Sequence, residues 1–142
     1  MKVKEIMTKN VIGVGPEETV EVAARTLERY NVGVLPVCGS NGKLCGMVTD
    51  RDLVIRCLAS GMRPDQTKVR QVMTGQVTSV DADMDVSVAA HLMGRRQIRR
   101  LPVTENGRLC GMLSLGDMAV RDDTAMDAAD ALGDIARNIS ER

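Results

Sequence analysis

The sequence predicts an α+β fold in which a β-α-β-β-α unit occurs twice and is followed by a C-terminal helix. Three observations support this fold: the chain repeats itself, strand-like and helix-like patterns alternate within each copy, and each copy contains an Asn-Gly turn between two apolar segments. Two such units, related by an approximate twofold axis with their sheets face to face, would bury apolar surface that neither could bury alone.

The internal repeat is visible at an offset of 66 residues. Residues 3–37 and 69–103 are identical at thirteen of 35 positions. After a deletion in a turn the offset becomes 65, and residues 42–56 match 107–121 at seven of 15 positions. The repeat divides the chain into a first copy at residues 1–60, a polar connector at 61–68, a second copy at 69–123 and a tail at 124–142.

The first strand and helix of each copy follow from local residue types. Short β-branched runs predict a strand, and Thr19 and Asp85 are good helix N-caps. Apolar residues at a period of 3.6 then predict helices that end near Tyr30 and Arg96. We therefore expect strands at 11–14 and 77–80, and helices at 20–30 and 86–96.

A hairpin and a second helix complete each copy. Asn41-Gly42 and Asn106-Gly107 each lie between two apolar strands. Asn-Gly favours a type I′ turn because that turn needs positive φ at both central positions. The predicted strands are 34–38 and 44–49 in the first copy and 101–104 and 109–114 in the second, with helices at about 50–60 and 115–122.

The tail predicts an amphipathic helix over 124–142. Thr124 can cap it, Asp residues are concentrated near its start, and Arg137 lies near its end, as the helix dipole favours. Its apolar stripe should pack either on its own module or on a second subunit, and the sequence leaves both possibilities open. The stripe consists of Ala128, Leu132, Ile135, Ala136 and Ile139.

Composition argues against several classes of function. Lys+Arg and Asp+Glu are both 19, and Tyr30 is the single aromatic residue, so neither phosphate contacts nor base stacking favours nucleic-acid binding. No apolar run approaches the roughly 18–20 residues that a membrane span needs. Four cysteines without a secretory segment suggest reduced thiols and a cytoplasmic location. With one His, no Ser-His-Asp order and no Gly-rich phosphate loop, we expect no enzyme activity.

The phrase Leu-Cys-Gly-Met occurs twice and is followed each time by a hydroxyl residue and an acid three positions further on. These pairs are Thr49 with Asp52 and Ser114 with Asp117. On its own, such a pair fits a capping box, in which the hydroxyl and the carboxylate each accept one backbone N–H at a helix start. This interpretation needs no ligand, and it stays open beside a functional one.

Taken together, the motifs are more specific than any one of them. Met-Thr, Leu-Pro-Val, Asn-Gly and Gly-Met-(Val/Leu)-(Thr/Ser)-x-x-Asp occur in the same order in both copies. Over residues 3–122 the chain resembles a tandem pair of CBS domains, the module named after cystathionine β-synthase, here as a stand-alone Bateman module. The resemblance implies a regulatory module that binds AMP, ADP, ATP or S-adenosylmethionine in two clefts between the repeats and signals to a partner protein in trans.

The resemblance also implies which residues bind the ligand. Asp52 and Asp117 would accept from the ribose hydroxyls, with Thr49 and Ser114 near the ribose or phosphate. The helix start would leave backbone amides for a phosphate. The adenine would lie against aliphatic side chains and backbone. These residues are Ile12, Val32, Gly33, Val34 and Pro36 in the first copy and Thr78, Ile98, Arg99, Arg100 and Pro102 in the second.

The two predicted sites differ in charge. Gly33-Val34 is small and neutral, whereas Arg99-Arg100 is doubly cationic. Family members often carry basic residues here that reach phosphates, and a guanidinium suits that role. Alternatively, one arginine points to solvent and the other pairs with an acid. We expect two unequal sites, with occupancy of one or both left open.

The resemblance implies a homodimer, a regulatory ligand rather than an obligatory cofactor, and an effector protein that the sequence does not identify. An alternative function is a redox- or zinc-responsive stress protein that acts through Cys38 and Cys45, which flank the first hairpin. Two thiolates fall short of the four ligands of a usual zinc site.

Overall fold

The computed structural model describes the backbone of residues 1–140 and the side chains of residues 1–138. It divides the chain into two compact units, each an α+β unit with one small sheet. The central unit is Ile12–Val77, and the terminal unit combines Met1–Val11 with Thr78–Arg142. Within the described range, no helix is long and apolar enough to cross a membrane.

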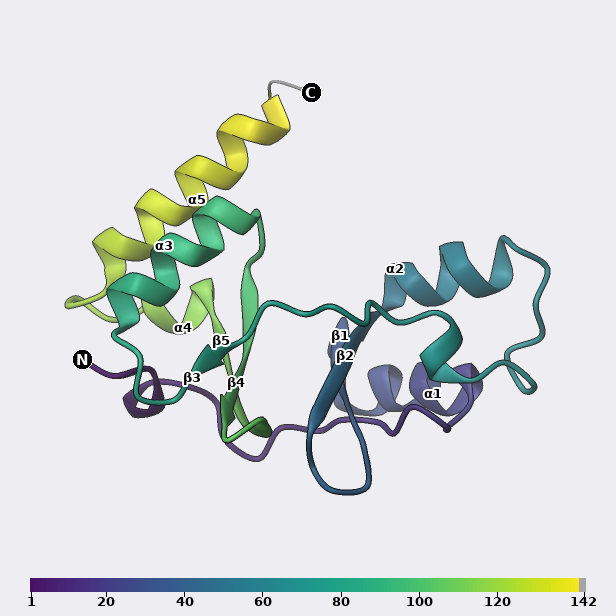
Figure 1. The fold of residues 1–142 in the computed structure, drawn as a ribbon. Helices are drawn as coiled ribbons and strands as arrows, with labels where there is room; N and C mark the ends of the chain where they lie inside the picture. Colours follow the sequence, from purple (N-terminus) through teal and green to yellow (C-terminus); the bar gives the residue numbers. More distant parts are fainter. Residues whose placement is uncertain (141–142) are drawn as a thin grey trace. The chain divides into compact units, whose positions relative to one another are not determined.

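The central unit contains a two-stranded antiparallel sheet and its helices (Figure 1). Val34 pairs with Thr49 and Val37 with Gly46, and the register shifts between Val37 and Cys38. The second helix starts as an α-helix and continues as a π-helical segment. The elements are α1 (Val20–Tyr30), β1 (Val34–Cys38), β2 (Leu44–Thr49), α2 (Asp50–Asp52), the π-helical η2 (Leu53–Leu58) and the 3₁₀ turn η3 (Val69–Gln71).

The terminal unit contains a three-stranded sheet in the order β3-β4-β5, with β3 parallel and β5 antiparallel to β4. The tail forms a helix that contacts α3 and α4, as Figure 1 shows. The elements are the 3₁₀ turn η1 (Val3–Glu5), β3 (Val80–Asp81), α3 (Val86–Arg96), β4 (Arg100–Glu105), β5 (Arg108–Ser114), α4 (Leu115–Ala119) and α5 (Ala125–Ser140).

The predicted helices at 20–30 and 86–96 are confirmed, with Thr19 and Asp85 as their N-caps. The predicted strands at 11–14 and 77–80 are wrong in extent. The first is reduced to one parallel bridge from Val14 to Val37, and the second begins at Val80. Gly13 and Gly15 flank Val14, and glycine weakens a strand because it has no side chain to pack.

The two hairpins also differ. Asn106 and Gly107 have φ of 53° and 79°, as the predicted type I′ turn requires. In the first hairpin only Gly42 has positive φ, and Gly39 N donates to Lys43 O at 3.0 Å across a longer loop. The type I′ prediction is therefore wrong at Asn41, because the first hairpin contains the extra residue that shifts the repeat offset from 66 to 65.

The Met-Thr segment of one copy pairs with the Gly-Met segment of the other copy, in both directions. The N–H and C=O of Thr8 pair with those of Met112 at 2.8 and 3.0 Å, and Thr74 pairs with Met47 at 2.9 and 3.0 Å. The Met-Thr segment of each copy is thus hydrogen-bonded to the Gly-Met segment of the other copy. As a result, the boundaries of the compact units differ from those of the sequence repeats.

Helix α5 packs on its own unit in the single chain. Ala128, Ala131 and Ile135 are buried with α3 and α4 in one core cluster. Of the predicted stripe, Ala128 and Ile135 are buried and Leu132 and Ala136 are exposed in the single chain, while the side chain of Ile139 lies outside the described residues. Gly94 of α3 allows this close approach, since a Cβ there would lie 3.4 Å from the Cα of Ala131.

The helix predicted at 115–122 ends earlier, at Ala119. Thr124 does not act as the simple N-cap that the sequence suggests: its buried hydroxyl donates to the carbonyl of Met118 at 2.7 Å. That bond satisfies a carbonyl at the end of α4 and holds the turn into α5.

Candidate functional site

Both helix starts after the hairpins carry the predicted capping box. Thr49 N donates to Asp52 Oδ2 at 2.9 Å, and Asp52 N donates to Thr49 Oγ1 at 3.1 Å. Ser114 and Asp117 make the same two bonds at 2.9 and 3.0 Å. Each carboxylate therefore uses one oxygen to complete its own helix, as the ligand-free interpretation requires.

The second carboxylate oxygen, Oδ1, has different surroundings in Asp52 and in Asp117. Asp52 Oδ1 lies 3.7 Å from Arg56 Nε, and the Asp52 side chain is 15% exposed. Arg121 occupies the position matching Arg56, but it pairs with Asp123 instead. Among the described residues, Asp117 Oδ1 has no hydrogen-bond or ion-pair partner. A carboxylate oxygen has lone pairs to accept from a diol, so Asp117 can cap its helix and bind hydroxyls at once.

The central unit brings together the predicted residues of the first copy. Gly33 O accepts from Asp50 N at 3.1 Å, which joins the start of β1 to the start of α2. Val34 lies opposite Thr49 in the sheet, and Pro36 O accepts from Val14 N at 3.1 Å. Ile12 and Val32 have exposed side chains. The predicted residues of β1 thus lie beside the Asp52 helix start, where the carboxylate of Asp50 is also close to Gly33.

The terminal unit repeats this arrangement with cationic residues. Arg99 O accepts from Leu115 N at 3.0 Å, and Arg100 lies opposite Ser114 in the sheet. Both arginine side chains are exposed, and within the described residues neither forms an ion pair. The alternative in which one of them pairs with an acid is therefore not observed. Pro102 is buried, while Ile98 and Thr78 are partly buried.

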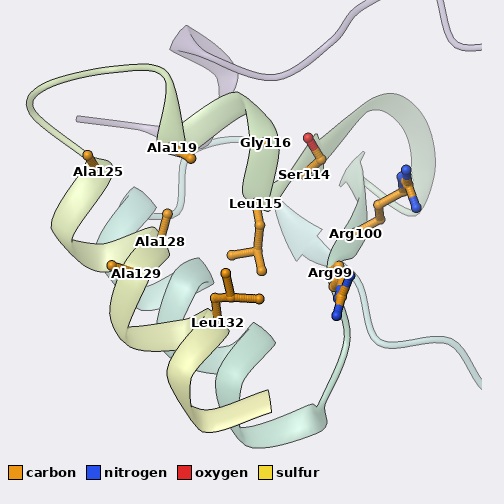
Figure 2. A pocket seen from close by; sticks show the side chains of 10 residues that line it. All are labelled: Arg99, Arg100, Ser114, Leu115, Gly116, Ala119, Ala125, Ala128, Ala129 and Leu132. Atoms are coloured by element: carbon orange, nitrogen blue, oxygen red, sulfur yellow. The ribbon is translucent and has the colours of Figure 1, made fainter. Parts of the chain in front are cut away.

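A pocket of about 520 Å³ lies beside this second helix start (Figure 2). Its walls come from the start of β4, from α4 and from α5. Sequence reasoning found Arg99, Arg100 and Ser114 but missed the contribution of α5, including Ala128 and Leu132. The alanine-rich start of α5 could have indicated a pocket wall there, because small side chains on a packed helix leave space beside it.

Comparison with known proteins identifies the family. The model of the CBS domain matches residues 3–58 and 69–123. The chain belongs to the CBS-domain family. The matches coincide with the two copies of the repeat, and each includes one hairpin and one capping acid.

Other CBS-domain proteins support this assignment. The CBS domain-containing protein YhcV of Bacillus subtilis is 40% identical over 134 residues, which is 94% of each chain. The CBS-domain pair of protein MJ0100, solved with 5′-methylthioadenosine and S-adenosyl-L-methionine, has a TM-score of 0.72 at 27% identity and covers 84% of this chain and 93% of its own. CBSX2, solved with AMP, has a TM-score of 0.71 at 31% identity and covers 82% and 91%.

A third solved structure contains a metal. Hypoxic Response Protein I, solved with two coordinated zinc ions, has a TM-score of 0.78 at 34% identity and covers 84% of this CBS-domain chain and 97% of its own. In the present chain Cys38 and Cys45 are free thiols, and Cys45 Sγ donates to Val37 O at 3.2 Å. The described residues contain no group of three or more His, Cys, Asp or Glu that could hold a metal.

The environment of these thiols disfavours the thiolate. Burial raises the pKa of Cys38, and the nearby Cys45 raises it further. Burial likewise raises the pKa of Cys45 and of Cys110 above their ordinary value. Since the thiolate is the nucleophile, the raised pKa values lower the nucleophilic fraction of these cysteines at neutral pH in the absence of a metal.

We expect iodoacetamide to modify Cys38, Cys45 and Cys110 several-fold more slowly at pH 7 in the folded protein than in guanidinium chloride, because the raised pKa values reduce the thiolate population. Raising the pH above 9 should accelerate the reaction. Peptide mapping by mass spectrometry measures each site. Equally fast labelling of Cys38 at pH 7 in both states would favour the redox alternative.

Proposed function

We propose that this protein is a non-catalytic regulatory module that binds an adenosine-containing ligand. The observation that carries the proposal is the Asp117 helix start. There one carboxylate oxygen caps the helix, the other has no partner among the described residues, and Arg100 lies across the hairpin from Ser114. A ribose diol can donate to the carboxylate while a guanidinium binds phosphate.

The two half-sites are proposed to differ in ligand preference. The terminal unit provides Arg99 and Arg100, whose charges are not compensated by ion pairs within the described residues. The central unit has Gly33 and Val34 at the matching positions. We expect nucleotides with phosphate groups to prefer the terminal half-site, because a phosphate there gains charge-assisted hydrogen bonds from Arg99 or Arg100 that Gly33 and Val34 do not offer.

We also propose a cytoplasmic homodimer that acts on an effector protein. The support for self-association is an apolar surface on the central unit, where Val54, Ile55 and Leu58 of η2 have side chains that are 51%, 49% and 58% exposed. Exposed apolar side chains grouped on one helix mark an interaction surface. The identity of the effector protein does not follow from the described residues.

A thermal-shift panel tests the ligand class. We expect AMP, ADP, ATP or S-adenosylmethionine to raise the melting temperature, since a ligand at about 100 times its Kd adds roughly 2.7 kcal/mol to the free energy of unfolding. GMP and CMP, which carry the same phosphate and ribose, are the matched controls for the base. A panel in which no adenosyl compound shifts the melting temperature at millimolar concentration contradicts the proposal.

A further inference from the structure

The side chain of Arg56 joins the Asp52 helix start to the segment that follows η3. Its Nε lies 3.7 Å from Asp52 Oδ1, and its Nη1 donates to the carbonyl oxygens of Val72 at 3.3 Å and Met73 at 3.2 Å. A guanidinium has five N–H donors in a planar fork, so one side chain can serve a carboxylate and two carbonyls together. Two backbone groups therefore hold Arg56 beside Asp52, in addition to the attraction between their charges.

Arg56 belongs to the π-helical segment η2. In this segment Ala59 N donates to Val54 O at 2.8 Å, a hydrogen bond between residues five positions apart. Such segments are rare, and they occur frequently at functional sites. Arg56 lies four residues after Asp52, and residues at this spacing are neighbours on a helix surface. The cation thus lies beside the acid that the central half-site is proposed to use.

The terminal unit lacks this arrangement. Arg121 matches Arg56 in the repeat, but it lies beyond the end of α4 and its Nε is 3.3 Å from Oδ1 of Asp123. Within the described residues, Asp117 Oδ1 has no partner, whereas Asp52 Oδ1 has a guanidinium. The two half-sites therefore differ in whether the second carboxylate oxygen is already paired before a ligand arrives.

A ribose diol would have to compete for Asp52. Oδ2 of this carboxylate accepts from Thr49 N, Oδ1 faces Arg56, and the side chain is 15% exposed. A hydroxyl that donates to Oδ1 must share that oxygen with the guanidinium or displace it, and a carboxylate has a limited number of acceptor positions.

We propose that Arg56 is a specificity-determining residue of the central half-site. It pairs with the Asp52 oxygen that a ribose diol needs, so this half-site binds the ribose of an adenosyl ligand more weakly than the Asp117 half-site does. This inference rests on the proposed function and names the residue that makes the two half-sites unequal toward ribose. The difference is independent of Arg99 and Arg100, which act on phosphate.

Adenosine is the probe, because it carries the ribose diol and has no phosphate. Calorimetric titration in an Asp117→Asn background measures the half-site that keeps its carboxylate. In this background Arg56→Gln should strengthen adenosine binding about fivefold, the upper range for the loss of an exposed ion pair. Arg56→Lys retains a cation and should give a smaller gain. Arg121→Gln is the matched control and should leave the affinity unchanged, because Arg121 pairs with Asp123.

A gain in affinity separates this role from a purely structural one. Losing the bonds to the Val72 and Met73 carbonyls can lower the melting temperature, but a loosened site binds its ligand more weakly, not more tightly. If adenosine binds the Asp117→Asn protein and Arg56→Gln leaves that affinity unchanged or lowers it, the role of Arg56 is wrong and the proposed function stands. If neither the unchanged protein nor any variant binds adenosine or AMP, both proposals are wrong.

Discussion

Gly46→Ala and Gly111→Ala are each expected to lower the free energy of unfolding by roughly 2 kcal/mol. A Cβ at Gly46 would lie 2.7 Å from Thr74 O, and one at Gly111 would lie 2.9 Å from Thr8 O. These oxygens belong to the backbone bridges that join the two copies crosswise, so they cannot move away without breaking hydrogen bonds. Urea unfolding, followed by circular dichroism, measures the loss.

Gly75→Ala is the matched control. It follows Thr74 directly, its φ is in the ordinary range, and a Cβ there would meet nothing within 4 Å. The substitution should be neutral or stabilising by up to about 1 kcal/mol, because alanine reduces the entropy of the unfolded chain. If Gly46→Ala is as stable as Gly75→Ala, the crosswise packing of the Met-Thr and Gly-Met segments is wrong.

Asp117→Asn is expected to weaken AMP binding about 100-fold, because two charge-assisted hydrogen bonds from the ribose lose their carboxylate acceptor. The asparagine Oδ1 can still accept from Ser114 N, so the capping box is retained and the melting temperature without ligand should change little. Asp52→Asn tests the central half-site in the same way. Calorimetric titration gives the affinity and the number of sites for each variant.

Ser114→Ala tests the helix cap by its stability. It removes the hydroxyl that accepts from Asp117 N and should cost about 1 kcal/mol of stability, which Asp117→Asn should not cost because it retains the bond from Ser114 N. If Asp52→Asn and Asp117→Asn both bind every stabilising adenosyl ligand as tightly as the unchanged protein, the two acids serve only as helix caps.

Much of the local structure could be predicted because it depends on near neighbours. Thr19 and Asp85 cap helices of eleven residues each, and Asn106-Gly107 forms the expected turn. Both capping boxes at Thr49 and Ser114 also follow from residues three positions apart. Backbone preferences and side-chain reach decide these features, and both can be read from a short stretch of sequence.

The crosswise pairing could not be predicted, and the duplication itself is the reason. Met7-Thr8 and Met73-Thr74 are identical, as are Gly46-Met47 and Gly111-Met112. Pairing within a copy and pairing between copies would therefore make the same local contacts. Only the path of the whole chain decides between the two, and a local pattern contains no information on that path.

Which residues of α5 are buried within the chain could not be predicted, for a different reason. A period of 3.6 residues indicates a stripe, but Leu132 and its neighbour Ala131 differ by only 100° around the helix. The larger side chain is the natural choice for burial, yet Ala131 is 2% exposed and Leu132 is 47% exposed. Gly94 contributes to this packing, because a Cβ there would lie 3.4 Å from the Cα of Ala131. That complementarity involves residues 37 positions apart.

The crosswise pairing of the Met-Thr and Gly-Met segments imposes an order on folding during synthesis. Residues 12–77 form a contiguous compact unit that leaves the ribosome as one stretch. Residues 1–11 emerge before the central unit, but their partners at Gly111 and Met112 are synthesised only after it. At roughly 5–20 residues per second, residues 1–11 wait for several seconds with their valine and methionine side chains uncovered.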